Sequence, residues 1–379
     1  MPKPSIDAIN AALATVNDPE INRPITELGM VKSVDVERNG TAKIGIYLTV
    51  AGCPMRAAIT ERVTAAVLTV ADVTDVRVEL DVMSDDQRAA MRNSLRGHDQ
   101  KEIPFAQPGS TTKVFAIASG KGGVGKSSVT ANLAVAMAEM GLSVGLVDAD
   151  VYGHSIPRIL NAMDAPTMVE GMIMPPQSYG VRVISMLPFK PGGMAQPVAF
   201  RGPMLHRALE QFLSDVWWGD LDVLLLDLPP GTGDIAISTA QLLPTSELVI
   251  VTTPQAASAD VAVRAGTLAA QTHQKVAGVI ENMSSFPCPH CGEPMDLFGV
   301  GGGDLVASMI SAELGAQVPL LGQIPFDVAL REGGDAGHPL VLSTPEAPAA
   351  MALRSIAETL GRKPRGLAGM ALGITPAGR

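Results

Sequence analysis

The sequence predicts an α/β protein in which helices flank a large parallel sheet and a small α+β domain precedes it. Three observations lead to this fold. Short, continuous apolar runs recur after residue 113, and such runs indicate strands buried on both faces of a parallel sheet. Before residue 95, helical spacing and strand alternation follow each other over short stretches. The 379 residues also exceed one comfortable hydrophobic core, so two domains are expected.

Residues 1–95 carry the patterns of the small α+β domain. Ser5 precedes the first helical pattern and is a suitable N-cap, while Asn39–Gly40 suits a tight hairpin turn between two strands. The predicted elements are, in order, helix 5–16, strand 30–37, strand 42–50, helix 55–71 and strand 76–82.

Residues 113–360 form the larger predicted domain. Polar residues 96–112 are expected to form a linker, and the Gly- and Pro-rich residues 361–379 a loose tail. The apolar runs expected as strands of the parallel sheet are Val114–Ala118, Val144–Val147, Val223–Leu226, Leu248–Val251 and Val276–Ile280.

Composition excludes several classes of protein. A net charge of −10 argues against a broad nucleic-acid-binding surface, which would need clustered Lys and Arg. No run approaches the ~18–20 apolar residues of a membrane span, and the acidic residues near the N-terminus do not fit a secretion signal. Three cysteines do not make a disulfide framework, so a cytoplasmic setting is expected.

A glycine-rich loop joins a predicted strand to a predicted helix and indicates a P-loop nucleotide hydrolase. Its glycines let backbone N–H groups turn toward phosphates, and the start of the helix adds positive partial charge. Lys126 would then neutralise the β- and γ-phosphates, and the Ser127 hydroxyl could ligate Mg²⁺. The residues expected to hold the nucleotide are Gly120, Lys121, Gly122, Gly123, Val124, Gly125, Lys126, Ser127 and Ser128.

Lys121, one residue into this loop, narrows the prediction. The loop resembles the deviant Walker A of the family that contains MinD, ParA, the nitrogenase iron protein and the Mrp/ApbC iron–sulfur carriers. The resemblance implies that Lys121 reaches across a homodimer interface to the partner's nucleotide. A solvated loop lysine is the alternative.

Two carboxylate motifs end predicted strands, where open α/β sheets place their ligands. The resemblance implies that Asp150 orients the attacking water, that Asp227 is the Walker B carboxylate near Mg²⁺, and that Gly231 lies in the switch sensing the γ-phosphate. Asp148 could support the metal through water. For these carboxylates and for Asp234, capping of a helix or turn is the alternative.

Fewer residues in the sequence indicate how the base of the nucleotide is recognised. Asn282 ends a predicted strand and matches the position from which the family contacts adenine, and the loop around Pro325 is expected to contribute. The chain also lacks an evident guanine-reading Asn-Lys-x-Asp motif. These features favour ATP over GTP.

Cys288 and Cys291 are spaced to hold one metal ion, with His290 between them expected to point outward. One pair supplies two ligands, whereas a closed zinc site or an iron–sulfur cluster usually needs four. A symmetric dimer would complete the set, and the ligand type suits zinc as well as a [4Fe–4S] cluster. A redox dithiol and a pair of unligated cysteines are the alternatives.

Further motifs narrow the resemblance to the Mrp/ApbC branch. The resemblance covers about residues 113–360. It implies a homodimeric ATPase that holds a labile iron–sulfur cluster between subunits and passes it to apo-proteins. The motifs are 148–157, 201–204, 218–219, 227–234, 281–283, 299–303 and the cysteine pair.

The N-terminal domain is similar to the small iron–sulfur-assembly domain often fused to such carriers. Its marks are Asp18-Pro-Glu20 and the turn 49–54, which contains Cys53. The start of the next helix would lower the pKa of the Cys53 thiol. A buried, inert cysteine is the alternative.

Other functions compete with the carrier. A MinD- or ParA-like positioning or partitioning ATPase would act through a membrane or DNA, but the tail contains glycines that disfavour an amphipathic helix, and the chain is acidic. A zinc-bridged dimeric ATPase remains open. An electron donor like the nitrogenase iron protein would use two well-separated cysteines, unlike the close pair here.

Overall fold

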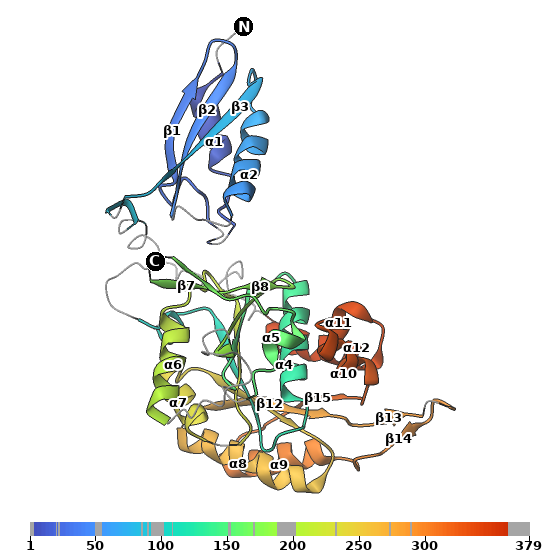
Figure 1. Cartoon of the computed structure of the whole chain (residues 1–379). Helices are drawn as coiled ribbons and strands as arrows, with labels where there is room; N and C mark the ends of the chain where they lie inside the picture. The colour runs from blue at the N-terminus through green and yellow to red at the C-terminus, as the bar shows by residue number, and fades with distance from the viewer. Residues whose placement is uncertain are drawn as a thin grey trace, which may run out of the picture. The chain divides into compact units, whose positions relative to one another are not determined.

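Figure 1 shows the computed structural model of the chain. The linker residues 96–101, the tail from 363 onward, and Glu20, Cys53 and Arg201 lie outside the described part, so nothing is said of their structure. The structure describes residues 4–19, 21, 23–49, 55–84, 86–88, 91, 102–107, 109–150, 153–169, 171–187, 202–231, 233–272, 274–288 and 290–362.

The chain divides into two compact units. The first contains Met1–Pro104 together with two short segments, Pro166–Pro175 and Gln211–Gly219, and the second contains the remaining residues. A 3-10 turn, Pro104–Ala106, lies where the sequence predicted a linker.

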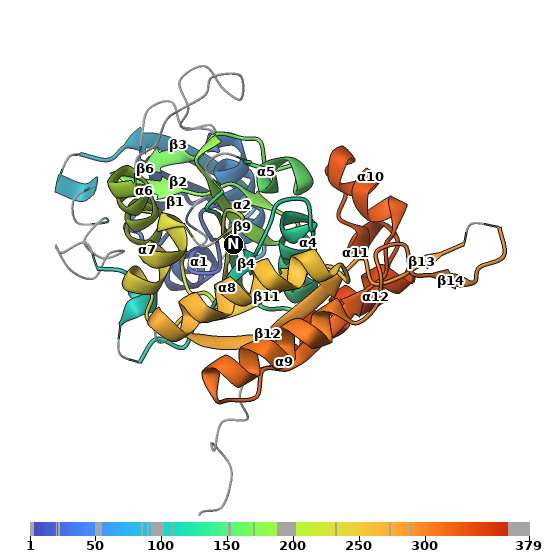
Figure 2. The same ribbon diagram turned by 90° about the horizontal axis from the view of Figure 1, so that it is seen from below.

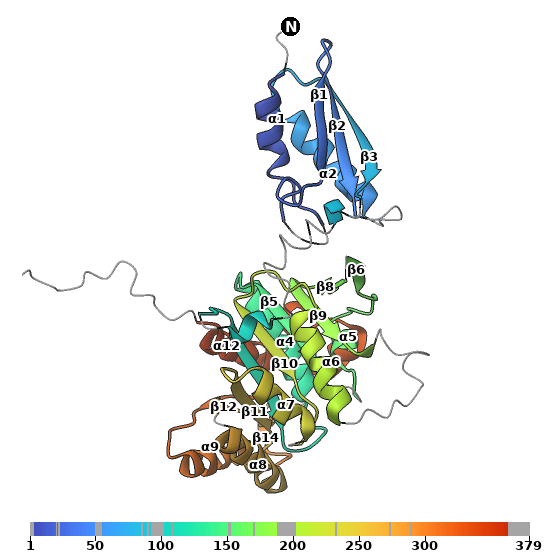
Figure 3. The ribbon, with the colours of Figure 1, turned by 90° about the vertical axis from the view of Figure 1, so that its left-hand side faces the viewer.

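The first unit is a three-stranded sheet with two helices on one face (Figures 1 and 3). Ser5 caps the first helix, because its hydroxyl accepts a 3.4 Å hydrogen bond from the Ala8 N–H. Strand β1 pairs antiparallel with β2, and β2 pairs parallel with β3 across the α2 connection. The five predicted elements are therefore confirmed, with bounds α1 Ile6–Leu13, β1 Val31–Val36, β2 Thr41–Leu48, α2 Arg56–Leu68 and β3 Asp75–Val82.

The second unit is built on an eight-stranded sheet in the order β15-β12-β11-β4-β10-β5-β9-β8. All neighbours pair in parallel except β8 and β9, which confirms the predicted parallel α/β fold. The strands are β4 Lys113–Ser119, β5 Val144–Asp148, β8 Gln177–Ser178, β9 Val181–Ser185, β10 Val223–Asp227, β11 Glu247–Thr252, β12 Lys275–Asn282 and β15 Leu320–Ile324.

Helices cover both faces of this sheet. Helices α4 and α12 pack together over one face and share its core with the central strands. Helices α8 and α9 run side by side over β11 and β12, as Figure 2 shows. The helices are α4 Lys126–Glu139, α5 Ile156–Ile159, α6 Gly202–Ser214, α7 Asp234–Leu242, α8 Ala256–Thr272, α9 Gly302–Leu314, α10 Val328–Ala336, α11 Leu340–Ser343 and α12 Pro348–Gly361.

Two short hairpins were not predicted. One joins β6 Thr167–Val169 to β7 Met172–Met174, and the other joins β13 Phe286–Pro287 to β14 Pro294–Met295. The second hairpin extends away from the sheet and its helices in Figures 1 and 2. Among the described helices, none combines the length and apolar character needed to cross a bilayer.

Candidate nucleotide and metal sites

The glycine-rich loop leads from β4 into α4, which begins at Lys126. Gly123 and Gly125 have positive φ angles of 83° and 79°, a backbone region that L-residues rarely adopt. A Cβ on Gly125 would also collide with the Asn282 side-chain amide. The loop therefore requires glycine at these positions, and its N–H groups stand at the start of a helix, where anions bind favourably.

Asp227 ends β10 and lies in register with Asp148 on the adjacent strand β5. The carboxylate of Asp227 is fully buried and is 2.7 Å from Lys126 Nζ, whose side chain is 6% exposed. Ser127 Oγ donates a 2.6 Å hydrogen bond to it, and Thr130 Oγ1 lies 2.8 Å away. Within the described residues, Lys126 Nζ has this ion pair but no hydrogen-bond acceptor of normal geometry. A phosphate oxygen beside Lys126 would fill that need.

Thr130 is a residue that the sequence prediction missed. It follows Lys126 by one helical turn, so both side chains lie on the same face of α4. This spacing is the signal that could have identified it. The oxygens of Ser127 and Asp227 are donors of the kind that Mg²⁺ prefers, and the donor set therefore fits the expected metal.

Asp148 is fully buried and accepts hydrogen bonds from the Asp150 N–H and from Ser185 Oγ, both 3.2 Å long. Burial raises the pKa of Asp148 well above its usual value, and the Asp227 and Asp150 carboxylates add to this shift. Asp148 thus fixes the start of the loop that contains Asp150 by accepting the Asp150 N–H.

Asp150 is half-buried, and its carboxylate accepts a 2.9 Å hydrogen bond from the Gly153 N–H. A Cβ on Gly153 would lie 2.6 Å from Asp150 Oδ2, so glycine permits this close turn. Gly231, expected in the sequence analysis to lie in a switch, has a φ of 95°, and its N–H donates a 2.8 Å hydrogen bond to the Ser119 carbonyl at the end of β4.

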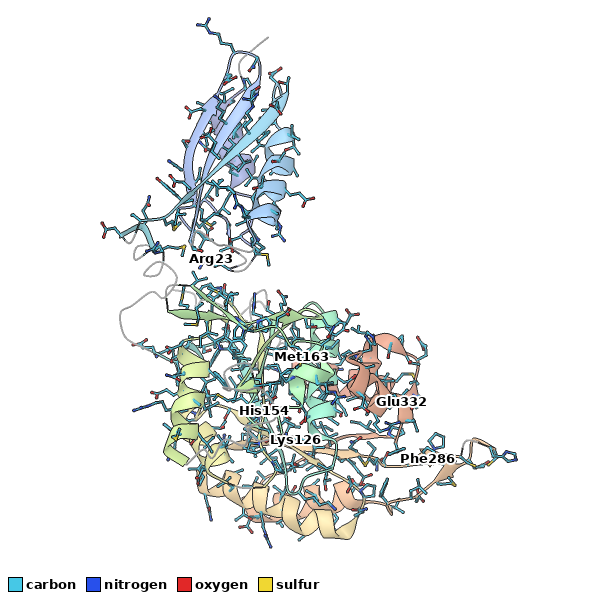
Figure 4. The ribbon with its side chains drawn as sticks, in the orientation of Figure 1. Arg23, Lys126, His154, Met163, Phe286 and Glu332 are labelled. Carbon is cyan, nitrogen blue, oxygen red and sulfur yellow. The ribbon has the colours of Figure 1, made fainter. Side chains whose placement is uncertain are left out.

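A cavity of about 590 Å³ brings most of the predicted nucleotide residues together. Lys126 and His154 lie close to one another in Figure 4 and both line this cavity. Asp227 and Gly120 are not among the residues that line it, although Asp227 pairs with the lining residue Lys126. The predicted residues in the lining are Lys121, Gly122, Gly123, Val124, Gly125, Lys126, Ser127, Ser128, Asp150, Asn282 and Pro325, and His154 and Arg331 are among the additions.

Two predicted residues make contacts that their sequence positions did not indicate. Lys121 Nζ donates a 2.8 Å hydrogen bond to Gln255 Oε1, just after β11. Asn282 is 3% exposed, and its amide donates a 2.9 Å bond to the Val124 carbonyl within the glycine-rich loop. Asn282 therefore braces that loop, and its contact with adenine stays a prediction.

Cys288 and Cys291 lie at the tip of the β13–β14 hairpin. The Cys288 N–H donates to the Glu293 carbonyl and the Gly292 N–H donates to the Cys288 carbonyl, each at 2.8 Å. Neither thiol is in a disulfide, and Cys291 and His290 are exposed. The backbone N–H groups of Cys291 and His290, together with the Cys291 side chain, lower the pKa of the Cys288 thiol. Cys288 is therefore biased toward the thiolate, the form that binds metals.

Within the described residues, no group of three or more potential metal ligands gathers in one place. The hairpin therefore offers two thiols, and the candidate phosphate-binding loop lies in the same unit.

Two family descriptions match this chain. Residues 110–361 match the ParA-type family described as the NUBPL iron-transfer P-loop NTPase, and residues 6–80 match an iron–sulfur cluster assembly protein. The family resemblance seen in the sequence motifs is thus confirmed.

Named relatives agree with these matches. A Mycobacterium tuberculosis protein named iron-sulfur cluster carrier protein is 60% identical over 98% of this chain and 97% of its own length, and a Deinococcus radiodurans protein of the same name is 43% identical over 93% and 94%. A solved nucleotide-binding protein from Archaeoglobus fulgidus, in complex with ADP, is 36% identical over 59% of this chain and 86% of that chain, with a TM-score of 0.48. The chain therefore belongs to the iron-transfer P-loop NTPase family, with an N-terminal iron–sulfur-assembly domain.

Proposed function

We propose that two copies of this chain bind and hydrolyse ATP, assemble a [4Fe–4S] cluster between them and transfer it to apo-proteins. The observation that carries this proposal is an exposed hairpin with two thiols in the same unit as a preformed phosphate cradle. A four-iron cluster takes four thiolate ligands. A second copy, related by a two-fold axis, supplies the missing pair.

The nucleotide half of the proposal uses the glycine-rich loop. Its N–H groups and the start of α4 hold the phosphates, and Lys126 neutralises their charge. Ser127 and Asp227 would hold Mg²⁺, which neutralises phosphate charge when bound. Ser128 and Asn282 complete the expected contacts. Lys121, which bonds Gln255 in the single chain, reaches the partner's nucleotide in the dimer.

Asp150 orients the attacking water from the wall of the cavity. The water oxygen bonds to the γ-phosphorus as the bond between that phosphorus and the β–γ bridging oxygen breaks. The products are ADP, inorganic phosphate and a proton released to solvent. Asp148 fixes the Asp150 loop by accepting the Asp150 N–H.

The cargo half uses Cys288 and Cys291 from each copy. Transfer exchanges the thiolates of the carrier for those of the recipient, so neither iron nor sulfur needs to change oxidation state. The name shared by the relatives, iron-sulfur cluster carrier protein, supports this assignment. Zinc is the substitute cargo to exclude, because four thiolates hold it equally well.

Anaerobic reconstitution followed by measurement of iron, sulfide and zinc tests the proposal. We expect about two irons and about two sulfides per chain, because four of each are shared by two chains, together with a visible absorption band. Cys288→Ser is the matched control and should lack them. Stoichiometric zinc without iron in protein purified from cells would refute the carrier function.

A further inference from the structure

Phe326 lies between the nucleotide cavity and the cysteine hairpin. It lines the cavity, and its ring also packs against two phenylalanines of the hairpin arms. Phe286, on the arm that enters the hairpin, meets it edge-on at 5.4 Å between ring centroids and 77°. Phe298, on the arm that leaves the hairpin, lies at 6.2 Å and 46°. We call these three residues the aromatic junction.

Backbone hydrogen bonds tie the same two segments together. The Phe326 N–H donates to the Ser285 carbonyl at 2.7 Å, and the Ser284 N–H donates to the Ile324 carbonyl at 3.0 Å. The segment that forms one wall of the cavity is therefore aligned with the base of the hairpin. Figure 4 places Phe286 at that base, between Lys126 and the hairpin tip.

A second connection runs from the phosphate cradle along the chain itself. Asn282 donates to the Val124 carbonyl of the glycine-rich loop. The next residue, Met283, lines the cavity and has a φ of 59°, an uncommon conformation for a residue other than glycine. Cys288 follows Met283 by five positions. A movement of the glycine-rich loop would therefore be passed through Asn282 to the segment that leads into the arm carrying Cys288.

The return arm is anchored at its far end. Glu281 is 1% exposed, and its carboxylate accepts the Gly303 N–H at 2.5 Å and the Gln323 side-chain amide at 2.7 Å. Gly303 lies in the first turn of α9, directly after the return arm. The Glu281 hydrogen bonds therefore hold the chain at the start of one arm and at the end of the other. The aromatic junction packs on both arms between these bonds and the hairpin tip.

We infer that Phe326 is a positioning residue through which nucleotide in the cavity sets the position of the Cys288–Cys291 hairpin. A base or ribose that contacts the Phe326 ring changes how this ring packs on Phe286 and Phe298. Offset and edge-on aromatic packing has preferred geometries, so a displaced ring favours a different placement of both arms. Thermodynamic linkage requires the reverse effect as well. If bound nucleotide changes the affinity of the hairpin for metal by some factor, bound metal changes the affinity for nucleotide by the same factor.

The identity of the cargo rests on the proposed function, but the coupling can be measured without any metal. The readout is the rate at which a maleimide labels Cys288 and Cys291 in metal-free, full-length protein carrying Cys53→Ser. Labelling is compared without nucleotide and with saturating Mg²⁺ and a non-hydrolysable ATP analogue. We expect nucleotide to change the labelling rate by about fivefold or more, the low end of ordinary allosteric coupling.

Phe326→Ala should bring the ratio of the two rates close to one at saturating nucleotide, whereas Phe326→Tyr, which keeps the ring, should preserve it. Phe298→Ala removes one contact and should reduce the ratio, which keeps the test valid if Phe326→Ala fails to fold. Leu297→Ala, at a neighbouring side chain that is 57% exposed, is the control and should behave as wild type.

An unchanged ratio in Phe326→Ala, or no effect of nucleotide on the wild type, would overturn the inference. Failure of the proposed function looks different. In that case the protein holds zinc or no metal, while the ratio of labelling rates still reports on the junction.

Discussion

Asp227 and Cys288 differ in how many of their partners a single chain supplies. Asp227 is fully buried, and its carboxylate is contacted by Lys126, Ser127 and Thr130 before any ligand arrives. Cys288 stands on a two-stranded hairpin, with Cys291 as its companion thiol. The buried site is preorganised, so binding a nucleotide needs little rearrangement of its own groups. Under the proposed function the hairpin supplies half of the four thiolates, and a second copy of the chain would supply the other half.

The two sites should be separable, and Cys288→Ser is the change with the largest expected effect. It removes one of the two thiols of the hairpin, so bound iron should fall by more than about tenfold. Nucleotide affinity, measured by titration of the metal-free variant and of metal-free wild type, should agree within about twofold, because no phosphate contact is altered. Met295→Ala on the paired strand is the control. Joint loss of iron and nucleotide would show that the sites are not separate.

Lys126→Ala tests the buried site. Loss of a charge-assisted contact worth about 1.5–3 kcal/mol should weaken nucleotide binding by about 10- to 150-fold. It also leaves the Asp227 carboxylate buried without its partner, so the apoprotein should lose about 3–5 kcal/mol in denaturant unfolding.

A surface ion pair provides the matched control for Lys126→Ala. Lys275 pairs with Glu247 at 3.0 Å but is 73% exposed. Lys275→Ala should therefore change stability by less than about 1 kcal/mol. Similar losses from both substitutions would mean that burial of the Lys126–Asp227 pair is not what makes it important.

Asp150→Ala separates chemistry from binding within the cavity. The carboxylate is expected to orient the attacking water, so kcat should fall by at least about tenfold while the dissociation constant for ATP changes by less than about threefold. Phosphate release and equilibrium titration measure the two quantities. Equal effects on both would make the assignment of Asp150 wrong.

Asp148→Asn should have the smallest effect, visible in the pH dependence of stability. The pKa of Asp148 is raised in the folded chain, so the folded state binds more protons than the unfolded state above the ordinary carboxyl pKa of 3.8. Its contribution to stability is therefore present at low pH and is lost as pH rises toward the raised pKa.

Denaturant unfolding of the metal-free apoprotein across this pH range measures the Asp148 effect. The wild type should lose more stability with rising pH than Asp148→Asn, which has no carboxyl to deprotonate. Asp164→Asn, at an exposed position, controls for removal of any one carboxyl. Parallel pH profiles for wild type and Asp148→Asn would contradict the burial argument.

Much of the sheet could be predicted because its strands are local patterns. The apolar runs that became β4, β5, β10, β11 and β12 are buried on both faces, and two of them end in aspartates that the register places side by side. Strand β15 was missed because it lies at the sheet edge, where Leu320–Ile324 is mostly half-buried and contains Gln323. The two short hairpins leave too little pattern for any period to be detected.

The site was predictable where a motif names adjacent residues, as in Gly120–Ser127. Contacts between distant segments were not. Ser185 reaches Asp148 from β9, and Gln255 reaches Lys121 from the end of β11. The packing of Phe326 on Phe286 likewise joins residues forty positions apart, and only the folded chain reveals it.

Native mass spectrometry after anaerobic reconstitution tests the central claim most directly: that two copies complete one four-thiolate site. We predict a species whose mass equals two chains and one [4Fe–4S] cluster, absent from Cys288→Ser. A cluster on a single chain, or a dimer that holds zinc and no iron, would contradict the account.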